Sequence, residues 1–299
     1  MKVILGLFSY GGVEEGTVDS ILRELSWASS NKIDMGYQRF SGDALISRSR
    51  SRVLGNFFNN KPGDVLVMVD HDVSWRPGDL THIARKAFES GELVGGLYCK
   101  RAFKKGWASR VPNVGTVRFG EDDKLLQTDS LATGFLAIPY SAVAKIIEEL
   151  SVTSETFKQK RKQLIDDGDY DELLTLHDLS IANIKDGAWK SAEHDYYDFF
   201  RCMRWPSGAG KNYPGATMQF LSEDWAFSIR ALHCGVKSYL STYPILTHTG
   251  NHGYIVSDGM DDVALRSHEA DERANTETDK GPDKGAGRAK KRVRKRRSS

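Results

Sequence analysis

Asp64-Val65-Leu66-Val67-Met68-Val69-Asp70-His71-Asp72 is the stretch that decides the fold of this 299-residue chain. Its apolar residues do not alternate with polar ones, which predicts a strand over 65–70 that is buried on both faces, as in parallel sheets. Ligands of open α/β sheets bind beyond the carboxyl ends of the strands, and here that end is Asp-His-Asp. In an extended segment Asp70 and Asp72 project to the same side. Such a pair suits Mg²⁺ or Mn²⁺ holding a phosphate; alternatively, it only caps the strand and starts a turn.

Strand and helix patterns alternate through much of the chain, which predicts an α/β fold with a mixed, mostly parallel sheet flanked by helices. The strands are expected at 2–8, 33–40, 65–70, 93–98, 131–138, 236–240 and 244–250. The helices are expected at 17–29, 44–59, 77–90 and 140–150, and from 222 onward. In the first helix, Val18, Ile21, Leu22 and Leu25 form the predicted apolar face, with Thr17 as a cap.

Two regions depart from this alternation. Residues 151–215 hold a charged, helical segment, an aromatic-rich segment and a glycine-containing loop. We interpret them as an insertion of helices and loops beside the active site, which serves as a lid or as an acceptor surface. Residues 284–299 hold nine Lys and Arg residues and no acid, which leaves the rest of the chain with a net charge of −7. We therefore expect one domain over 1–260 and a disordered basic tail over 271–299.

Composition excludes several protein classes. No stretch approaches the roughly 18–20 apolar residues of a membrane helix, and the first residues form too short an apolar run for a signal peptide. Cys99, Cys202 and Cys234 are scattered without C-x-x-C spacing, which argues against a disulfide framework or zinc cluster and favours a reducing cytoplasm, that of a host cell if the protein is viral.

The helix predicted over 44–59 carries a second candidate binding group. Arg48 and Arg52 are four residues apart and share a face, where they would suit a diphosphate next to the Asp-His-Asp turn. The alternative is a solvated basic face, with Arg50 as a further exposed charge.

Three other positions have a functional and a structural interpretation. The loop at Ser9-Tyr10 would hold a nucleotide, with the Tyr10 ring stacked on the base, or is an ordinary turn. Gly134 lies inside a predicted strand, where glycine marks a bulge or the close approach of a ligand. Glu223 and Asp224 would act as a base or hold an acceptor hydroxyl, or they are the acidic first turn of a helix.

Taken in order, these pieces resemble nucleotide-sugar-dependent glycosyltransferases of the GT-A fold, above all the compact versions found in phages and large viruses. The resemblance covers roughly 2–150 and 216–255. It rests on Gly6-Leu7-Phe8-Ser9-Tyr10, Ile46-Ser47-Arg48-Ser49-Arg50-Ser51-Arg52, Val67-Met68-Val69-Asp70-His71-Asp72, Val94-Gly95-Gly96-Leu97-Tyr98, Thr133-Gly134-Phe135, Glu223-Asp224-Trp225-Ala226-Phe227 and His248-Thr249-Gly250. Relatives often carry Arg-Asn where this chain has Ser51-Arg52, and residues 151–215 lie outside the resemblance.

The resemblance implies a GT-A (Rossmann-like) domain that uses a UDP- or GDP-sugar. It implies Mn²⁺ or Mg²⁺ on the diphosphate, held by Asp70, Asp72 and His248. The implied donor contacts are Ser9, Tyr10, Arg48, Arg52, Asp70 and His71. Asp224, with Glu223, resembles the base that deprotonates the acceptor hydroxyl in inverting enzymes; in a retaining enzyme Asp224 would orient the acceptor.

The basic tail is the clue to the acceptor. Nine cations in sixteen residues bind polyanions without sequence preference, so the acceptor is either DNA with a hydroxylated base, flipped out for reaction, or a virion protein or glycan. An alternative of a different class is a non-enzymatic nucleic-acid-binding protein that uses this tail. A metal-dependent nuclease built on Asp70, Asp72 and Glu223 ranks lower, because further paired carboxylates are absent.

Overall fold

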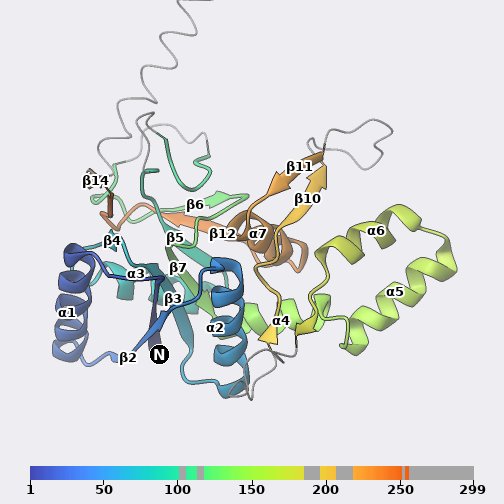
Figure 1. The fold of residues 1–299 in the computed structure, drawn as a ribbon, viewed down its shortest axis with the longest axis horizontal. Coiled ribbons are helices and arrows are strands. Elements are labelled where there is room, and N and C mark those ends of the chain that lie inside the picture. Colours follow the sequence, from blue (N-terminus) through green and yellow to red (C-terminus); the bar gives the residue numbers. More distant parts are fainter. Residues whose placement is uncertain (101–105, 113–117, 185–195, 207–217, 251–252, 256–299) are drawn as a thin grey trace, which may run out of the picture. The chain divides into compact units, whose positions relative to one another are not determined.

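The computed structural model describes residues 1–100, 106–112, 118–184, 196–206, 218–250 and 253–255. Seven strands form its main sheet in the order β2-β1-β3-β7-β5-β12-β6 (Figure 1). These strands are β1 (Lys2–Ser9), β2 (Asp34–Ser41), β3 (Val65–Asp70), β5 (Leu93–Gly96), β6 (Leu125–Thr128), β7 (Phe135–Pro139) and β12 (Ser238–Ser241). Strand β1 pairs in parallel with β2 and with β3, and β5 pairs in parallel with β12. Strand β7 runs antiparallel to its neighbours β3 and β5, and β6 runs antiparallel to β12. The predicted mixed, mostly parallel sheet is confirmed.

Helices cover both faces of this sheet (Figure 1). The helices of the main domain are α1 (Glu15–Ser30), α2 (Ile46–Asn60), α3 (Asp79–Ser90), α4 (Tyr140–Leu150) and α7 (Glu223–His233). Residues of α1 and α3 share one hydrophobic cluster, and residues of α2, α4 and α7 share the other. None of the helices that the structure describes is long and apolar enough to cross a membrane.

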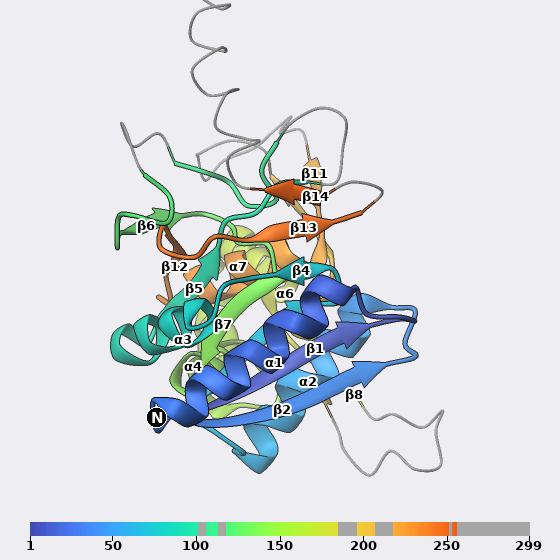
Figure 2. The same cartoon turned by 90° about the vertical axis from the view of Figure 1, so that its left-hand side faces the viewer.

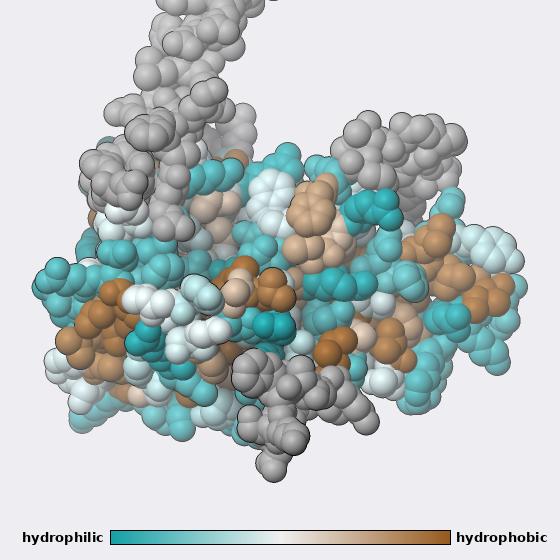
Figure 3. Space-filling view, viewed as in Figure 1, coloured by the Kyte–Doolittle hydropathy of each residue, from teal (hydrophilic) through white to brown (hydrophobic). Residues whose placement is uncertain are grey.

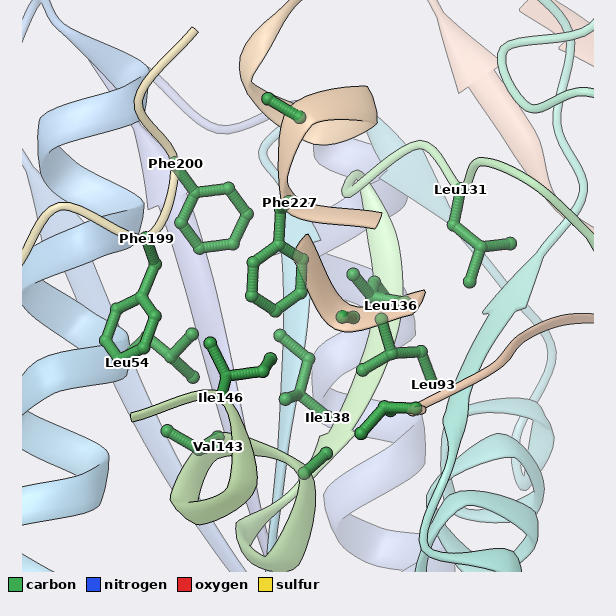
Figure 4. Close-up of a cluster of buried hydrophobic side chains, with 14 of the residues drawn as sticks. Leu54, Leu93, Leu131, Leu136, Ile138, Val143, Ile146, Phe199, Phe200 and Phe227 are labelled. Atoms are coloured by element: carbon green, nitrogen blue, oxygen red, sulfur yellow. The ribbon is translucent and has the colours of Figure 1, made fainter. Parts of the chain in front are cut away.

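Strand β3 lies between the two clusters, which is why its sequence is apolar without alternation. Val65, Val67 and Val69 pack into the cluster with α1 and α3, while Leu66 and Met68 pack into the cluster with α2, α4 and α7. All five side chains are buried. Figure 4 shows the second cluster, where Phe199, Phe200 and Phe227 meet aliphatic side chains such as Ile138 and Ile146.

The predicted apolar face of α1 is only half right: Ile21 is buried and Leu25 packs against the core, but the other two residues are exposed. Val18 and Leu22 are 41% and 62% exposed, whereas Thr17, Ser20 and Glu24 are buried. The helix begins at Glu15, so Thr17 is not its cap; the Thr17 hydroxyl instead donates to the carbonyl of Val73 over 3.0 Å. Polar side chains are buried here because the segment after β3 offers them backbone partners.

A small sheet in the order β14-β13-β4 lies at the carboxyl end of β3. Its strands are β4 (Val73–Ser74), β13 (Thr247–Thr249) and β14 (Gly253–Ile255). Figure 2 shows β13 running alongside β4. This pairing brings a segment from late in the sequence to the Asp-His-Asp turn.

The region predicted as an insertion holds α5 (Glu155–Asp167), α6 (Tyr170–Leu179) and two short hairpin-like pairs. The pairs are β8 (Asn183–Ile184) with β9 (Tyr196–Tyr197) and β10 (Met203–Pro206) with β11 (Met218–Leu221). Helix α5 packs against α4 and α6 (Figure 1). The predicted disordered tail over 271–299 lies outside the described residues.

Candidate active site

Asp70 and Asp72 lie at the carboxyl end of β3, but in different environments. The side chain of Asp70, the last residue of β3, is 27% exposed, and that of Asp72 is only 4% exposed. Burial of a carboxylate costs free energy unless a charged or hydrogen-bonding partner compensates. Each of the two carboxylates has such a partner from a distant part of the chain.

His248 is the partner of Asp72. In the pairing of β13 with β4, His248 lies opposite Val73, and the amide of Thr249 donates to the carbonyl of Asp72 over 2.8 Å. His248 Nε2 is 3.5 Å from Asp72 Oδ1. The other ring nitrogen, Nδ1, is 2.7 Å from the carbonyl oxygen of Cys99; since a carbonyl only accepts, Nδ1 carries a proton. Nε2 is therefore the atom that faces the carboxylate, and a metal ion between the two would contact both.

Arg50, on α2, is the partner of Asp70. Its Nη2 donates to Asp70 Oδ1 over 2.6 Å, and its Nη1 donates to Glu223 Oε1 over 3.0 Å. The Arg50 side chain is 5% exposed, which corrects the interpretation of Arg50 as an exposed charge. Burial alone lowers the pKa of Arg50, but the carboxylates of Asp70 and Glu223 outweigh it and the pKa is raised. The guanidinium therefore remains charged and joins β3 to α7.

The spacing of apolar residues along α2 already indicates that Arg50 is buried. Arg50 precedes Val53, Leu54 and Phe57 by three, four and seven residues, so it lies on the buried face of α2. All three of those apolar residues are buried. A charged residue on such a face requires a partner, which makes it a candidate functional or structural ion pair.

Arg48 and Arg52, the predicted phosphate ligands, lie next to Asp43. Arg48 Nη2 is 2.7 Å from Asp43 Oδ1, and Arg52 Nη1 is 3.8 Å from Asp43 Oδ2. The hydrogen bond from Arg48 lowers the pKa of Asp43. Diphosphate binding by these arginines stays a prediction, and it would require competition with Asp43.

Gly134 adjoins both Tyr98 and Asp70. It lies one residue before β7, not inside the strand as predicted. Its amide donates to the Tyr98 hydroxyl over 2.9 Å, and a Cβ atom at this position would lie 2.4 Å from Tyr98 Oη and 2.9 Å from Asp70 Oδ2. Burial raises the pKa of Tyr98, and the neighbouring charge of Asp70 raises it further. Glycine is required here because the side chains of Tyr98 and Asp70 approach the backbone.

Glu223 and Asp224 begin α7, with Ser222 as the residue before the helix. Glu223 faces Arg50. Asp224 Oδ1 accepts hydrogen bonds from the Ser222 hydroxyl and from the amide of Trp225, the latter over 2.8 Å. Both acids lie in the first turn of α7, whose first residue is preceded by Ser222 without a side-chain cap, and Arg50 ties Glu223 to the end of β3.

Ser9, Tyr10 and His71 border the same sheet edge. In the parallel pairing of β1 and β3, Phe8 lies opposite Asp70, so Ser9 and Tyr10 follow at that level. Ser9 is buried and its hydroxyl accepts from Arg39 Nε over 3.1 Å, whereas Tyr10 is 70% exposed. The carbonyl of His71 accepts from the Glu14 amide over 3.0 Å. Their predicted role in donor binding remains a prediction.

Metal binding at this edge also remains a prediction. Within the described part of the chain, no group of three His, Cys, Asp or Glu side chains is spaced to hold a metal ion. The best-matched donors are the pair Asp72 Oδ1 and His248 Nε2, since oxygen and imidazole nitrogen both suit Mn²⁺. One oxygen of Asp70 is already occupied by Arg50.

Comparisons with known proteins give distant structural similarities. A197 from STIV aligns with 84% of this chain and 86% of its own, at 16% identity and a TM-score of 0.43. S. aureus TarS 1-349 aligns with 48% of this chain and 48% of its own, at 12% identity and a TM-score of 0.31. No protein-family model matches the chain, and no curated protein sequence does.

Proposed function

We propose that this protein is a metal-dependent glycosyltransferase that moves a sugar from a nucleoside-diphosphate sugar to an acceptor hydroxyl. The observation that carries the proposal is the contact of Arg50 with both Asp70 and Glu223. Through Arg50, the Asp-His-Asp turn and the Glu-Asp helix start face one site at the carboxyl edge of the sheet. Such an edge is where α/β proteins bind ligands.

On the donor side, Asp72 and His248 would hold Mn²⁺ or Mg²⁺, with Asp70 as a further ligand. When bound, the ion supplies positive charge to the departing diphosphate. Asp72 is buried beside His248, so the carboxylate is positioned before any ligand arrives. Tyr10 is exposed at the same edge and offers its ring to the base of a UDP- or GDP-sugar.

On the acceptor side, Asp224 and Glu223 would take the proton of the acceptor hydroxyl. Glu223 faces the Arg50 guanidinium, with Oε1 3.0 Å from Nη1. Both acids also lie in the first turn of α7, and negative charge is stabilised at this positive end of a helix dipole. Carboxylates are among the side chains that act as general bases.

The acceptor that we favour carries negative charge, because the tail over 284–299 is strongly basic. DNA with a hydroxylated base fits that charge, and a virion protein or glycan is the alternative. The competing function is non-enzymatic nucleic-acid binding through the tail, in which case Asp70, Asp72 and His248 would be dispensable.

The test is thermal unfolding with a panel of UDP- and GDP-sugars, with and without Mn²⁺. One nucleotide sugar at about one hundred times its Kd should stabilise the wild type by about 2.7 kcal/mol. The Asp72→Asn variant should lose the Mn²⁺-dependent part of this effect. Asp19→Asn, at an exposed carboxylate on α1, is the matched control and should keep it.

Two outcomes would overturn the proposal. One is stabilisation by no donor, together with tight, salt-sensitive binding of DNA, which would support the binding-protein function instead. The other is equal donor stabilisation in Asp72→Asn and wild type, which would separate donor binding from the Asp-His-Asp turn.

A further inference from the structure

A cavity of about 500 Å³ lies among α5, α6 and the segment around Asp198–Arg201. It shares no lining residue with the candidate active site. Phe157 and Leu176, both buried, and the partly buried Leu173 contribute apolar surface to it. Figure 3 shows hydrophobic side chains at the right-hand end of the molecule, where α5 and α6 lie in Figure 1.

Cations surround this apolar surface. Lys158, Arg161 and Arg201 line the cavity, against one acidic residue, Asp198. Asp198 is already paired with Arg201 Nε over 3.2 Å, and Lys158 with the exposed Glu155 over 2.7 Å. In the part of the chain that the structure describes, Arg161 has no ion-pair partner, so its charge is available to a ligand.

The wall that carries Arg201 is firmly attached to the main domain. Arg201 Nη2 donates to the carbonyl of Ser180 over 2.7 Å. The carbonyl of Arg201 in turn accepts from Nη1 of Arg230 over 2.7 Å, and Arg230 is a fully buried residue of α7. The cavity is thus bounded by hydrogen-bonded backbone and by helices, which favours a preformed site.

From this combination we infer that the cavity binds a small amphipathic anion, that is, a ligand with an apolar face and a phosphate, sulfonate or carboxylate group. The apolar face lies on Phe157, Leu173 and Leu176, and the anionic group pairs with Arg161 at the rim. A guanidinium binds such oxyanions through two parallel hydrogen bonds. The inference does not rest on glycosyl transfer, because binding here requires neither Asp72 nor a nucleotide sugar.

The probe is 8-anilinonaphthalene-1-sulfonate, an aromatic anion whose fluorescence rises in apolar sites. It should bind the folded wild-type chain at one saturable site. Arg161→Glu should weaken binding about tenfold or more, the effect of losing a hydrogen bond to a charged group and adding repulsion. Lys162→Glu is the matched control: it makes the same charge change one residue along α5, and Lys162 does not line the cavity.

Two further arms complete the test. Ala182→Phe fills the cavity from a lining position and should abolish saturable binding at an unchanged thermal midpoint. N-phenyl-1-naphthylamine, which lacks the sulfonate, should bind weakly and respond equally to wild type and Arg161→Glu. Equal weakening by Arg161→Glu and Lys162→Glu, or undiminished binding to Ala182→Phe, would overturn the inference. Displacement of the probe by a nucleotide sugar from wild type but not from Asp72→Asn would also overturn it, because it would place the probe in the donor site.

Discussion

Arg50 and Glu223 are 173 positions apart in the sequence, yet Arg50 Nη1 donates to Glu223 Oε1 over 3.0 Å. The same guanidinium holds Asp70. One buried cation therefore sets the distance between the end of β3 and the start of α7. If the protein transfers sugars, that distance separates the donor phosphates from the base.

Replacement of Arg50 should impair both stability and activity. Arg50→Met leaves the carboxylates of Asp70 and Glu223 without their shared cation, and we expect a loss of about 2–3 kcal/mol in the free energy of unfolding, below the usual range for buried pairs because both acids are partly hydrated. Arg50→Lys keeps the positive charge, but its single ammonium group can pair closely with only one of the two carboxylates. We therefore expect this variant to keep most of the wild-type stability and to lose most of the activity. Urea unfolding and donor-dependent turnover measure the two effects. Arg23→Met, at an exposed pair, should change neither.

Gly134→Ala should disturb the site through Tyr98. The added methyl group would lie 2.4 Å from Tyr98 Oη, so we expect a loss of more than 2 kcal/mol in unfolding free energy. Removing the hydroxyl by Tyr98→Phe should partly rescue Gly134→Ala, which a double-mutant cycle would detect as a coupling of about 1 kcal/mol. Strict additivity would show that the clash is relieved elsewhere. Gly106→Ala, with open space around its Cβ position, is the control.

Glu24 should be sensitive to replacement by its own amide. The buried carboxylate accepts hydrogen bonds from Trp75 Nε1, the Gly78 amide, and both the amide and hydroxyl of Thr81. Glu24→Gln places an NH₂ group against two of these donors, and we expect a cost of about 2–3 kcal/mol. The thermal midpoint should fall accordingly.

The loss in unfolding free energy caused by Glu24→Gln should depend on pH, in a direction set by the pKa of Glu24. Burial raises the pKa of Glu24 more than its four hydrogen bonds lower it. A carboxyl with a raised pKa in the folded state contributes most below its unfolded pKa, and the contribution falls as pH rises through the folded pKa. The advantage of wild type over Glu24→Gln should therefore be larger near pH 4 than near pH 8. An advantage that grows with pH would contradict the raised pKa.

Arg230 should be required to hold the inserted region on α7. It donates to the carbonyls of Leu179, Phe199 and Arg201, and burial lowers its pKa to about 10. Arg230→Met leaves three carbonyls without this donor, at an expected cost of about 3 kcal/mol. Hydrogen exchange should become faster in α6 while β3 stays protected; equal loss of protection in both would show global destabilisation instead. Arg118→Met, at an exposed side chain, is the control.

Elements with an unambiguous local pattern were predictable from the sequence. Strand β3 and helix α4 have the predicted bounds, because each is an uninterrupted apolar or amphipathic run. Asp70 lies at the end of β3 for the same local reason. The face of α1 was only partly predictable by hydrophobicity, because its buried polar side chains find partners in the segment after β3.

Pairings between distant residues were not predictable in the same way. The apolar stripe of α2 shows that Arg50 is buried, but it does not show which acids it meets. Those partners depend on the neighbours of α2 in three dimensions. For the same reason Arg48 and Arg52 looked like free phosphate ligands, although Asp43 accepts hydrogen bonds or ion pairs from both.

The pairing of β13 with β4 has a consequence for how the protein is made. A ribosome adding about 5–20 residues per second needs on the order of ten to thirty seconds between Asp72 and His248. The last strand of the main sheet, β12, ends at Ser241, so every strand of that sheet leaves the ribosome before His248 does. Arg50 is synthesised before Asp70 and is present to neutralise it throughout this interval. The nascent chain thus completes the strands of its main sheet before it can pair His248 with Asp72.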